Sequence, residues 1–199
     1  MQYPLDLSFK VLTLTPQIYI KDATDTLVLY VRQKLLKLKE EVTIYAGPDQ
    51  IAHPNNYLYK INADRVIDWS ARYRFSSMNE VELGSVKRYG TRSLWKAHYD
   101  IYEGQDTKMT IREANPFIKV VDTIFGQIPI LNIITNYLFH PTYNVMNNQD
   151  GRIVMRLKKR PSFFQSKFII EKNTVLEQRE EEVVLLSLLM LILLERKRG

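Results

Sequence analysis

Hydrophobic and polar residues alternate along most of the first 110 residues, with the period of two that is typical of β-strands. Segments rich in Val, Ile, Tyr, Phe and Thr carry this pattern, and turn-forming Asp, Asn, Gly and Pro separate them. We predict strands at 5–14, 17–21, 27–33, 41–46, 57–62, 70–75, 81–87, 94–102 and 108–112. Strands at intervals of about ten residues indicate an antiparallel sandwich or barrel.

The strand pattern also contains a weak internal repeat. Each copy reads as a strand, a polar turn, a second strand that ends in basic residues, and a returning strand. The copies cover 18–45, 73–101 and 143–170. The repeat predicts a fold built from equivalent hairpins, and chance similarity among β-rich segments is the alternative.

The segment 116–140 departs from the strand pattern. Its apolar residues have helical spacing from Phe117 to Phe125, until Gly126 and Pro129 interrupt it. Polar side chains within the segment argue against a membrane span, because polar groups are costly in lipid. We predict a helical insertion near 116–140 that caps the sheet. A surface that contacts a membrane or a second copy is the alternative.

A second helix is predicted at the C-terminal end, where 183–194 is apolar at every position except Ser187. Twelve residues of helix are roughly 18 Å long, well short of the ~30 Å hydrocarbon core of a bilayer. Acidic residues precede the segment and basic residues follow it, as the helix dipole favours. A helix that is apolar on all sides must be surrounded by protein. We therefore predict a barrel closed around this helix, with a tail anchor or a helix-helix dimer as alternatives.

Composition is that of one folded domain covering 1–199. Hydrophobic residues make up 45% and charged residues 25%, with only 7 Gly and 8 Pro, which excludes disordered and collagen-like classes. The absence of cysteine excludes disulfides, thiolate nucleophiles and sulfur-based zinc sites. No signal peptide is visible, so we expect a cytoplasmic location.

Signals of catalysis are sparse. None of the motifs GxSxG, HExxH, GxxxxGK[ST] and GxGxxG occurs. A structural role in a strand or a solvated loop position explains the histidines better than catalysis does. Asp22 and Asp25 are too few carboxylates for a calcium site. We therefore expect no catalytic residue, no cofactor and no metal. An enzyme with a cavity at the barrel mouth is retained as a lower-ranked hypothesis.

Basic residues cluster after each repeated hairpin. If the copies are equivalent, these clusters converge at one rim of the barrel and form an anion site suited to phospholipid headgroups. The candidate anion-binding or lipid-binding residues are Lys34, Lys37, Arg88, Arg92, Lys158, Lys159 and Arg160. A set of solvated strand ends is the simpler explanation. Nucleic acid ranks lower, because the net charge of +6 is small for such a binder.

Three sequence segments and the apolar helix that follows them carry a resemblance to a known family. The segments are FKVLTLTPQIYIKDATDTLVLYVRQKLLKLKEEVTIY, SVKRYGTRSLWKAHYDI and GRIVMRLKKRPSFFQSKFIIEK. With them the chain resembles the LURP-one-related family, whose fold is shared with the tubby C-terminal domain and the phospholipid scramblases. The resemblance implies a mainly β fold, a tubby-like twelve-stranded antiparallel barrel around a central hydrophobic C-terminal helix. The insertion near 116–140 departs from that common core, and so do Asp25 and Thr26 at a turn where relatives often have glycine.

Among these relatives, tubby domains bind phosphoinositide headgroups and scramblases are associated with lipid movement. The resemblance therefore implies a non-enzymatic binding or scaffolding module that binds anionic phospholipid peripherally at the membrane. The alternative is a protein-interaction or structural module that docks through the apolar insertion 117–139. An enzyme or a nucleic-acid binder ranks below both.

Overall fold

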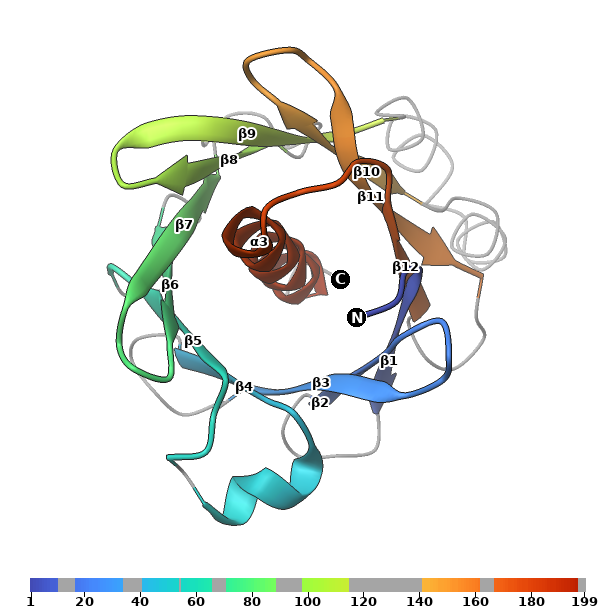
Figure 1. Ribbon diagram of the computed structural model, residues 1–199, viewed down its shortest axis with the longest axis vertical. Helices are drawn as coiled ribbons and strands as arrows, with labels where there is room; N and C mark the ends of the chain where they lie inside the picture. Colours follow the sequence, from blue (N-terminus) through green and yellow to red (C-terminus); the bar gives the residue numbers. More distant parts are fainter. Residues whose placement is uncertain are drawn as a thin grey trace, which may run out of the picture.

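The computed structural model describes residues 1–10, 17–33, 41–53, 55–65, 71–88, 98–114, 141–161 and 167–196. These residues form a closed antiparallel barrel with an α-helix along its middle (Figure 1). The predicted mainly β fold, with a central C-terminal helix, is thereby confirmed. The predicted insertion near 116–140 lies outside the described residues.

Twelve strands make up the described barrel. They are β1 (Leu5–Lys10), β2 (Gln17–Lys21), β3 (Leu27–Gln33), β4 (Glu41–Tyr45), β5 (Tyr59–Ala63), β6 (Arg72–Ser77), β7 (Glu82–Arg88), β8 (His98–Glu103), β9 (Asp106–Glu113), β10 (Thr142–Asn147), β11 (Ile153–Arg160) and β12 (Lys167–Lys172). Each strand pairs with the next along the chain, and β12 pairs with β1, so the sheet has no open edge.

Alternate residues of each strand point into the barrel, as the period of two predicts. On β1, Leu5, Leu7 and Phe9 are at most 1% exposed, while Asp6 and Ser8 point outward. The inward apolar side chains of the strands form one continuous core with the helix. Closure of the barrel and burial of the core therefore depend on the same contacts between the strands and the helix.

The central helix α3 (Gln178–Arg196) fills the barrel. Between Val184 and Leu193 no residue is more than 2% exposed, so every face of the helix is covered. Ser187 is the one polar residue in this stretch, and its hydroxyl donates a 2.7 Å hydrogen bond to the carbonyl of Val183. The helix thus satisfies its only buried hydroxyl internally.

The first turn of α3 is attached to the barrel wall by polar contacts. The Arg179 guanidinium donates hydrogen bonds to the carbonyls of Glu82 at 3.2 Å and Leu83 at 3.3 Å. Lys172 of β12 forms an ion pair with Glu181. These contacts fix how deep the helix lies in the barrel.

Three hairpins share the same irregularity, which supports the predicted repeat. The strand register shifts after Ile20 in β2–β3, after Phe75 in β6–β7 and after Val145 in β10–β11. A β-bulge inserts one unpaired residue into one strand of a pair. In these hairpins the unpaired residues are Val28, Leu83 and Val154, and all three pack on the core. A further shift occurs in β8–β9.

The turns of these hairpins are also alike. Asp25 has φ 64°, Glu80 has φ 60° and Gly151 has φ 71°, each near the end of its turn. In the first two turns a backbone N–H donates to the carbonyl four residues later, and in the third turn to the carbonyl five residues later. The repeated hairpins are therefore equivalent units that start four strands apart.

A small second cluster lies outside the barrel. Tyr30 and Tyr45 point outward from β3 and β4, and Tyr57 joins them from the connection between β4 and β5. The short 3-10 helix η1 (Pro48–Ala52) lies in that connection, and its Ile51 packs on the tyrosines. This cluster gives the outer face of these strands a local apolar cover.

Candidate anion-binding surface

The two ends of the barrel are built differently. At one end, short turns join β2 to β3, β6 to β7, β8 to β9 and β10 to β11, and α3 begins. At the other end β3, β7 and β11 finish, and so does α3. The strand ends that adjoin the three predicted basic clusters therefore all lie at this second end.

Acidic residues predominate at the end where α3 begins. Within two residues of the strand ends, and in the turns and the start of α3, the described residues include fourteen carboxylates and six basic residues. The carboxylates are Asp6, Asp22, Asp25, Asp49, Glu80, Glu82, Glu103, Asp106, Asp150, Glu171, Glu177, Glu180, Glu181 and Glu182. We call this the acidic end.

The opposite end has the reverse composition. Within two residues of the strand ends there, the described residues include twelve basic residues and four carboxylates. The basic residues are Lys10, Arg32, Arg65, Arg72, Arg74, Lys87, Arg88, Arg112, Lys158, Lys159, Arg160 and Lys167. We call this the basic end. The barrel is therefore strongly polarised along its axis, which the modest net charge of +6 conceals.

The structure places four of the seven predicted anion-binding residues. Lys34, Lys37 and Arg92 lie outside the described residues. Lys158 and Arg160 point outward from β11, and both meet carboxylates. Lys158 Nζ lies 2.7 Å from Glu171 Oε1, and an Arg160 guanidinium nitrogen lies 3.4 Å from Asp6 Oδ1. About half of the Arg160 side chain remains exposed, and somewhat less of Lys158.

The remaining two predicted residues point the other way. Arg88 follows Val86 at the inward positions of β7, pairs with Tyr99, and is only 7% exposed. Lys159 occupies the inward register on β11, beyond Leu157, and is half-buried. The structure therefore does not bring Arg88 to the outer surface with Lys158 and Arg160.

The strand register identifies a set of equivalent basic residues. The basic clusters in the sequence do not single them out. Arg32 pairs with the first residue of β2, Lys87 with the first residue of β6, and Lys158 with the first residue of β10. These three residues are therefore equivalent in the repeat. In each case the preceding residue is a buried inward aliphatic, and this alternation is the sequence signal that could have found them.

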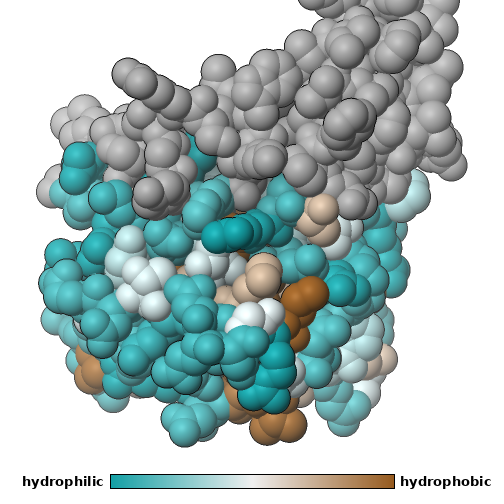
Figure 2. Space-filling view, turned by 90° about the horizontal axis from the view of Figure 1, so that it is seen from above, coloured by the Kyte–Doolittle hydropathy of each residue, from teal (hydrophilic) through white to brown (hydrophobic). Residues whose placement is uncertain are grey.

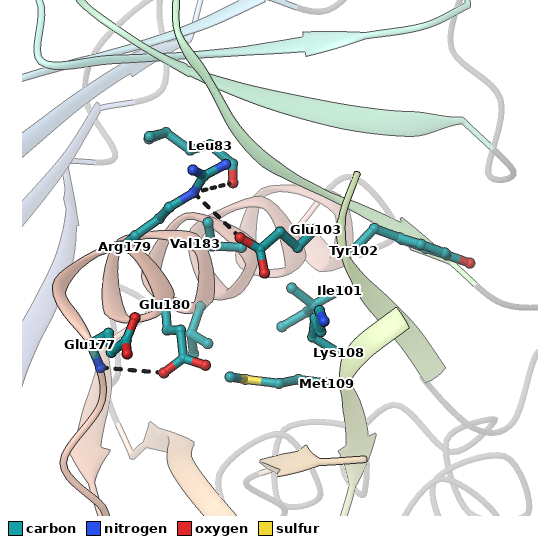
Figure 3. Close-up of a pocket in the computed structure, with 11 residues that line it drawn as sticks. Leu83, Ile101, Tyr102, Glu103, Lys108, Met109, Glu177, Arg179, Glu180 and Val183 are labelled. Atoms are coloured by element: carbon teal, nitrogen blue, oxygen red, sulfur yellow. Dashed lines mark hydrogen bonds and ion pairs between the residues drawn. The ribbon is translucent and has the colours of Figure 1, made fainter. Parts of the chain in front are cut away.

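A cavity of about 90 Å³ lies between the start of α3 and strands β7 to β9 (Figure 3). Its floor is apolar and includes Ile101, Met109 and Val183. At its mouth Arg179 Nε lies 3.7 Å from Glu103 Oε1. The volume corresponds to only about three water molecules, whereas sites for small-molecule ligands typically have several hundred Å³. This cavity alone is too small for a typical substrate.

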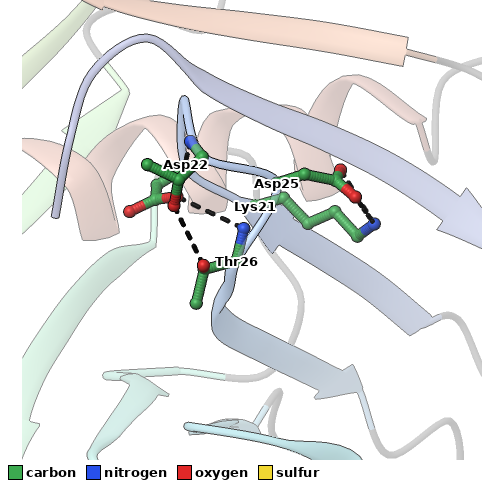
Figure 4. Close-up of polar contacts among 5 residues, drawn as sticks. Lys21, Asp22, Asp25 and Thr26 are labelled. Atoms are coloured by element: carbon green, nitrogen blue, oxygen red, sulfur yellow. Dashed lines mark hydrogen bonds and ion pairs between the residues drawn. The ribbon is translucent and has the colours of Figure 1, made fainter.

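The two aspartates of the β2–β3 turn bond to residues within the turn and beside it (Figure 4). Asp22 Oδ1 accepts hydrogen bonds from the Thr24 hydroxyl at 2.6 Å, the Thr24 N–H at 2.9 Å and the Thr26 N–H at 3.3 Å. These bonds, the Thr24 hydroxyl first, lower the pKa of Asp22. Asp25 pairs with Lys21 at 2.9 Å. Within the described ranges no group of three or more His, Cys, Asp or Glu is arranged to hold a metal.

On the face seen in Figure 2, hydrophilic side chains cover most of the described surface. The large hydrophobic residues that are exposed in the described part all belong to the acidic end: Met1, Leu58, Met78, Val81 and Val175. None of the described helices has both the length and the apolar character needed to cross a bilayer. Comparison of the chain with protein-family models, curated proteins and solved structures finds no match.

Proposed function

We propose that this protein is a non-enzymatic binding module that associates peripherally with anionic phospholipid through the basic end of the barrel. The observation that carries the proposal is the separation of charge between the two ends. The described residues at the basic end include twelve basic residues and four carboxylates. Those at the acidic end include fourteen carboxylates and six basic residues. Such a molecule is attracted to a negative surface at one end and repelled at the other.

The energetics favour a charged surface rather than insertion into lipid. Each Lys or Arg near an anionic membrane contributes about 1 kcal/mol, and the contribution falls off within a Debye length of about 8–10 Å. The ion pairs of Lys158 and Arg160 reduce their share, because Glu171 and Asp6 already neutralise part of their charge. Attraction therefore has to come from many cations together. The resemblance to the LURP-one-related family agrees with this reading.

Vesicle flotation tests the proposal. The purified protein is mixed with neutral phosphatidylcholine vesicles, or with vesicles that also contain phosphatidylserine, at low and near-physiological salt. We expect flotation only with the anionic vesicles, and less of it at the higher salt. Equal flotation with both kinds of vesicle, or none with either, would overturn the proposal.

A matched pair of triple variants locates the surface. One variant carries Lys158→Gln, Lys159→Gln and Arg160→Gln at the basic end. The other carries Lys21→Gln, Lys108→Gln and Arg152→Gln at the acidic end and changes the net charge equally. We expect the first to weaken flotation and the second to float like the unmodified protein. Loss of flotation in both would show that net charge, not the basic end, drives binding.

A further inference from the structure

Arg32, Lys87 and Lys158 are distributed evenly around the barrel. They occupy equivalent positions on β3, β7 and β11, and these strands lie four apart in a closed ring of twelve. Four strands at ~4.8 Å span about 19 Å of sheet. Because this exceeds the Debye length at physiological salt, the three cations interact with a charged surface independently of one another.

All three side chains point outward at the basic end. The residues that precede them, Val31, Val86 and Leu157, are at most 1% exposed and belong to the core. Successive side chains of a strand point to opposite faces, so the cations lie on the outer face. Lys158 pairs with Glu171, whereas Arg32 and Lys87 form no ion pair with a described carboxylate.

We propose that the barrel binds an anionic membrane end-on, with Arg32, Lys87 and Lys158 contacting headgroups at three separate places around the basic end. This inference rests on the proposed function and adds an orientation to it. A barrel lying on its side would bring at most two of the three cations to the membrane. End-on binding brings all three to the surface, and it holds the acidic end as far from the negative lipid as the barrel allows.

Single substitutions distinguish the two orientations. Arg32→Gln, Lys87→Gln and Lys158→Gln are compared with the unmodified protein in partitioning onto phosphatidylserine-containing vesicles. We expect Arg32→Gln and Lys87→Gln each to weaken partitioning by about fivefold, and Lys158→Gln to weaken it less, because Glu171 already neutralises part of its charge. The triple variant should weaken partitioning by more than about 25-fold. If any one of the three substitutions leaves partitioning unchanged, the end-on orientation is wrong. Circular dichroism checks that every variant is folded.

Fluorescent labels give a second test, because the chain contains no cysteine. An environment-sensitive dye is attached through Ala114→Cys at the basic end or Val175→Cys at the acidic end, both of which are exposed positions. End-on binding predicts a spectral shift on adding anionic vesicles only for the label at 114. Similar shifts at both positions would overturn the orientation. An unmodified protein that does not bind the vesicles at all would instead overturn the proposed function.

Discussion

Gly84 of β7 packs directly against Val183 of α3, and a methyl group added to Gly84 would crowd the valine side chain. A Cβ added to Gly84 would be 3.0 Å from Val183 Cγ1 and 2.7 Å from the carbonyl oxygen of Tyr102. The equivalent inward positions of the other two repeated hairpins hold Leu29 and Met155, which fill the space with their own side chains. The helix therefore approaches the barrel wall most closely at the one repeat that has glycine at this inward position.

Replacing Gly84 by alanine should destabilise the protein by about 1–3 kcal/mol, because the methyl group overpacks a contact with backbone on one side. Urea denaturation measures the loss. Adding Val183→Ala should restore only part of it, since the Tyr102 carbonyl remains in place.

Gly47→Ala is the control for this change. A Cβ at Gly47 meets only the flexible Asp49 side chain, so stability should change by less than about 0.5 kcal/mol. Equal losses at the two glycines would contradict the packing argument.

Removing 183–199 should prevent the barrel from folding. The deletion exposes the inward faces of the strands and removes a series of leucines, each of which contributes about 1.5–3 kcal/mol when fully buried. Near-ultraviolet circular dichroism and thermal melting give the readout. A soluble truncated chain with a cooperative melt would show that the helix is not the core of the fold.

Ser187→Ala should leave stability within about 1 kcal/mol of the unmodified protein. The lost hydroxyl bonds only to the Val183 carbonyl, which is a helix backbone group, and alanine has the higher helix propensity. Ser187→Asp should instead unfold the protein, because it places a carboxylate at a position with 0% exposure. Chemical denaturation of the two variants separates the effects of side-chain size and charge.

Alkaline pH should weaken the barrel through two tyrosines near the start of α3. Burial and the neighbouring Glu182 carboxylate raise the pKa of Tyr59 to about 12, and burial with Glu181 raises the pKa of Tyr3 still further. The folded state therefore keeps protons that the unfolded state loses above about pH 10. Stability should be fully present below pH 10 and fall between pH 10 and 12.

Tyr59→Phe isolates this effect. Without the hydroxyl, the melting temperature should fall less steeply over the same alkaline range. An unchanged slope in Tyr59→Phe would assign the alkaline loss to other groups.

Asp22 should make the protein sensitive to acid. Its pKa is lowered by the Thr24 hydroxyl and by backbone N–H groups, so its contribution to stability is present above about pH 3.9 and is lost as the pH falls through the lower folded value. Asp22→Ala should lower the melting temperature at neutral pH and flatten its decline in acid. Asp25→Asn, which breaks only the exposed pair with Lys21, is the control and should change the melting temperature little.

The closed barrel was predictable mainly from one segment, although a tail anchor and a helix-helix dimer were alternatives. A helix as apolar as 183–194 needs protein on every side, and strands that alternate in polarity supply an apolar inner face. The repeated hairpins were also predictable from the sequence. Their polar turns and basic strand ends recur in the sequence, and the structure shows matching bulges.

The direction of individual side chains was not predictable to the same degree. A shift of one residue in register moves a side chain to the other face, and bulges introduce such shifts. Arg88, which is predicted at the surface, is therefore buried, and Arg32, which is not among the predicted anion-binding residues, is equivalent to Lys158. The outer tyrosine cluster was missed because its members come from three separate segments.

The order of elements along the chain constrains how the protein is made. The strand that closes the ring, β12, and the helix that fills it, α3, follow all the other strands. A growing chain on the ribosome therefore displays apolar strand faces and unpaired edges, with nothing yet available to bury them. The barrel core cannot be completed until α3 has emerged from the ribosome.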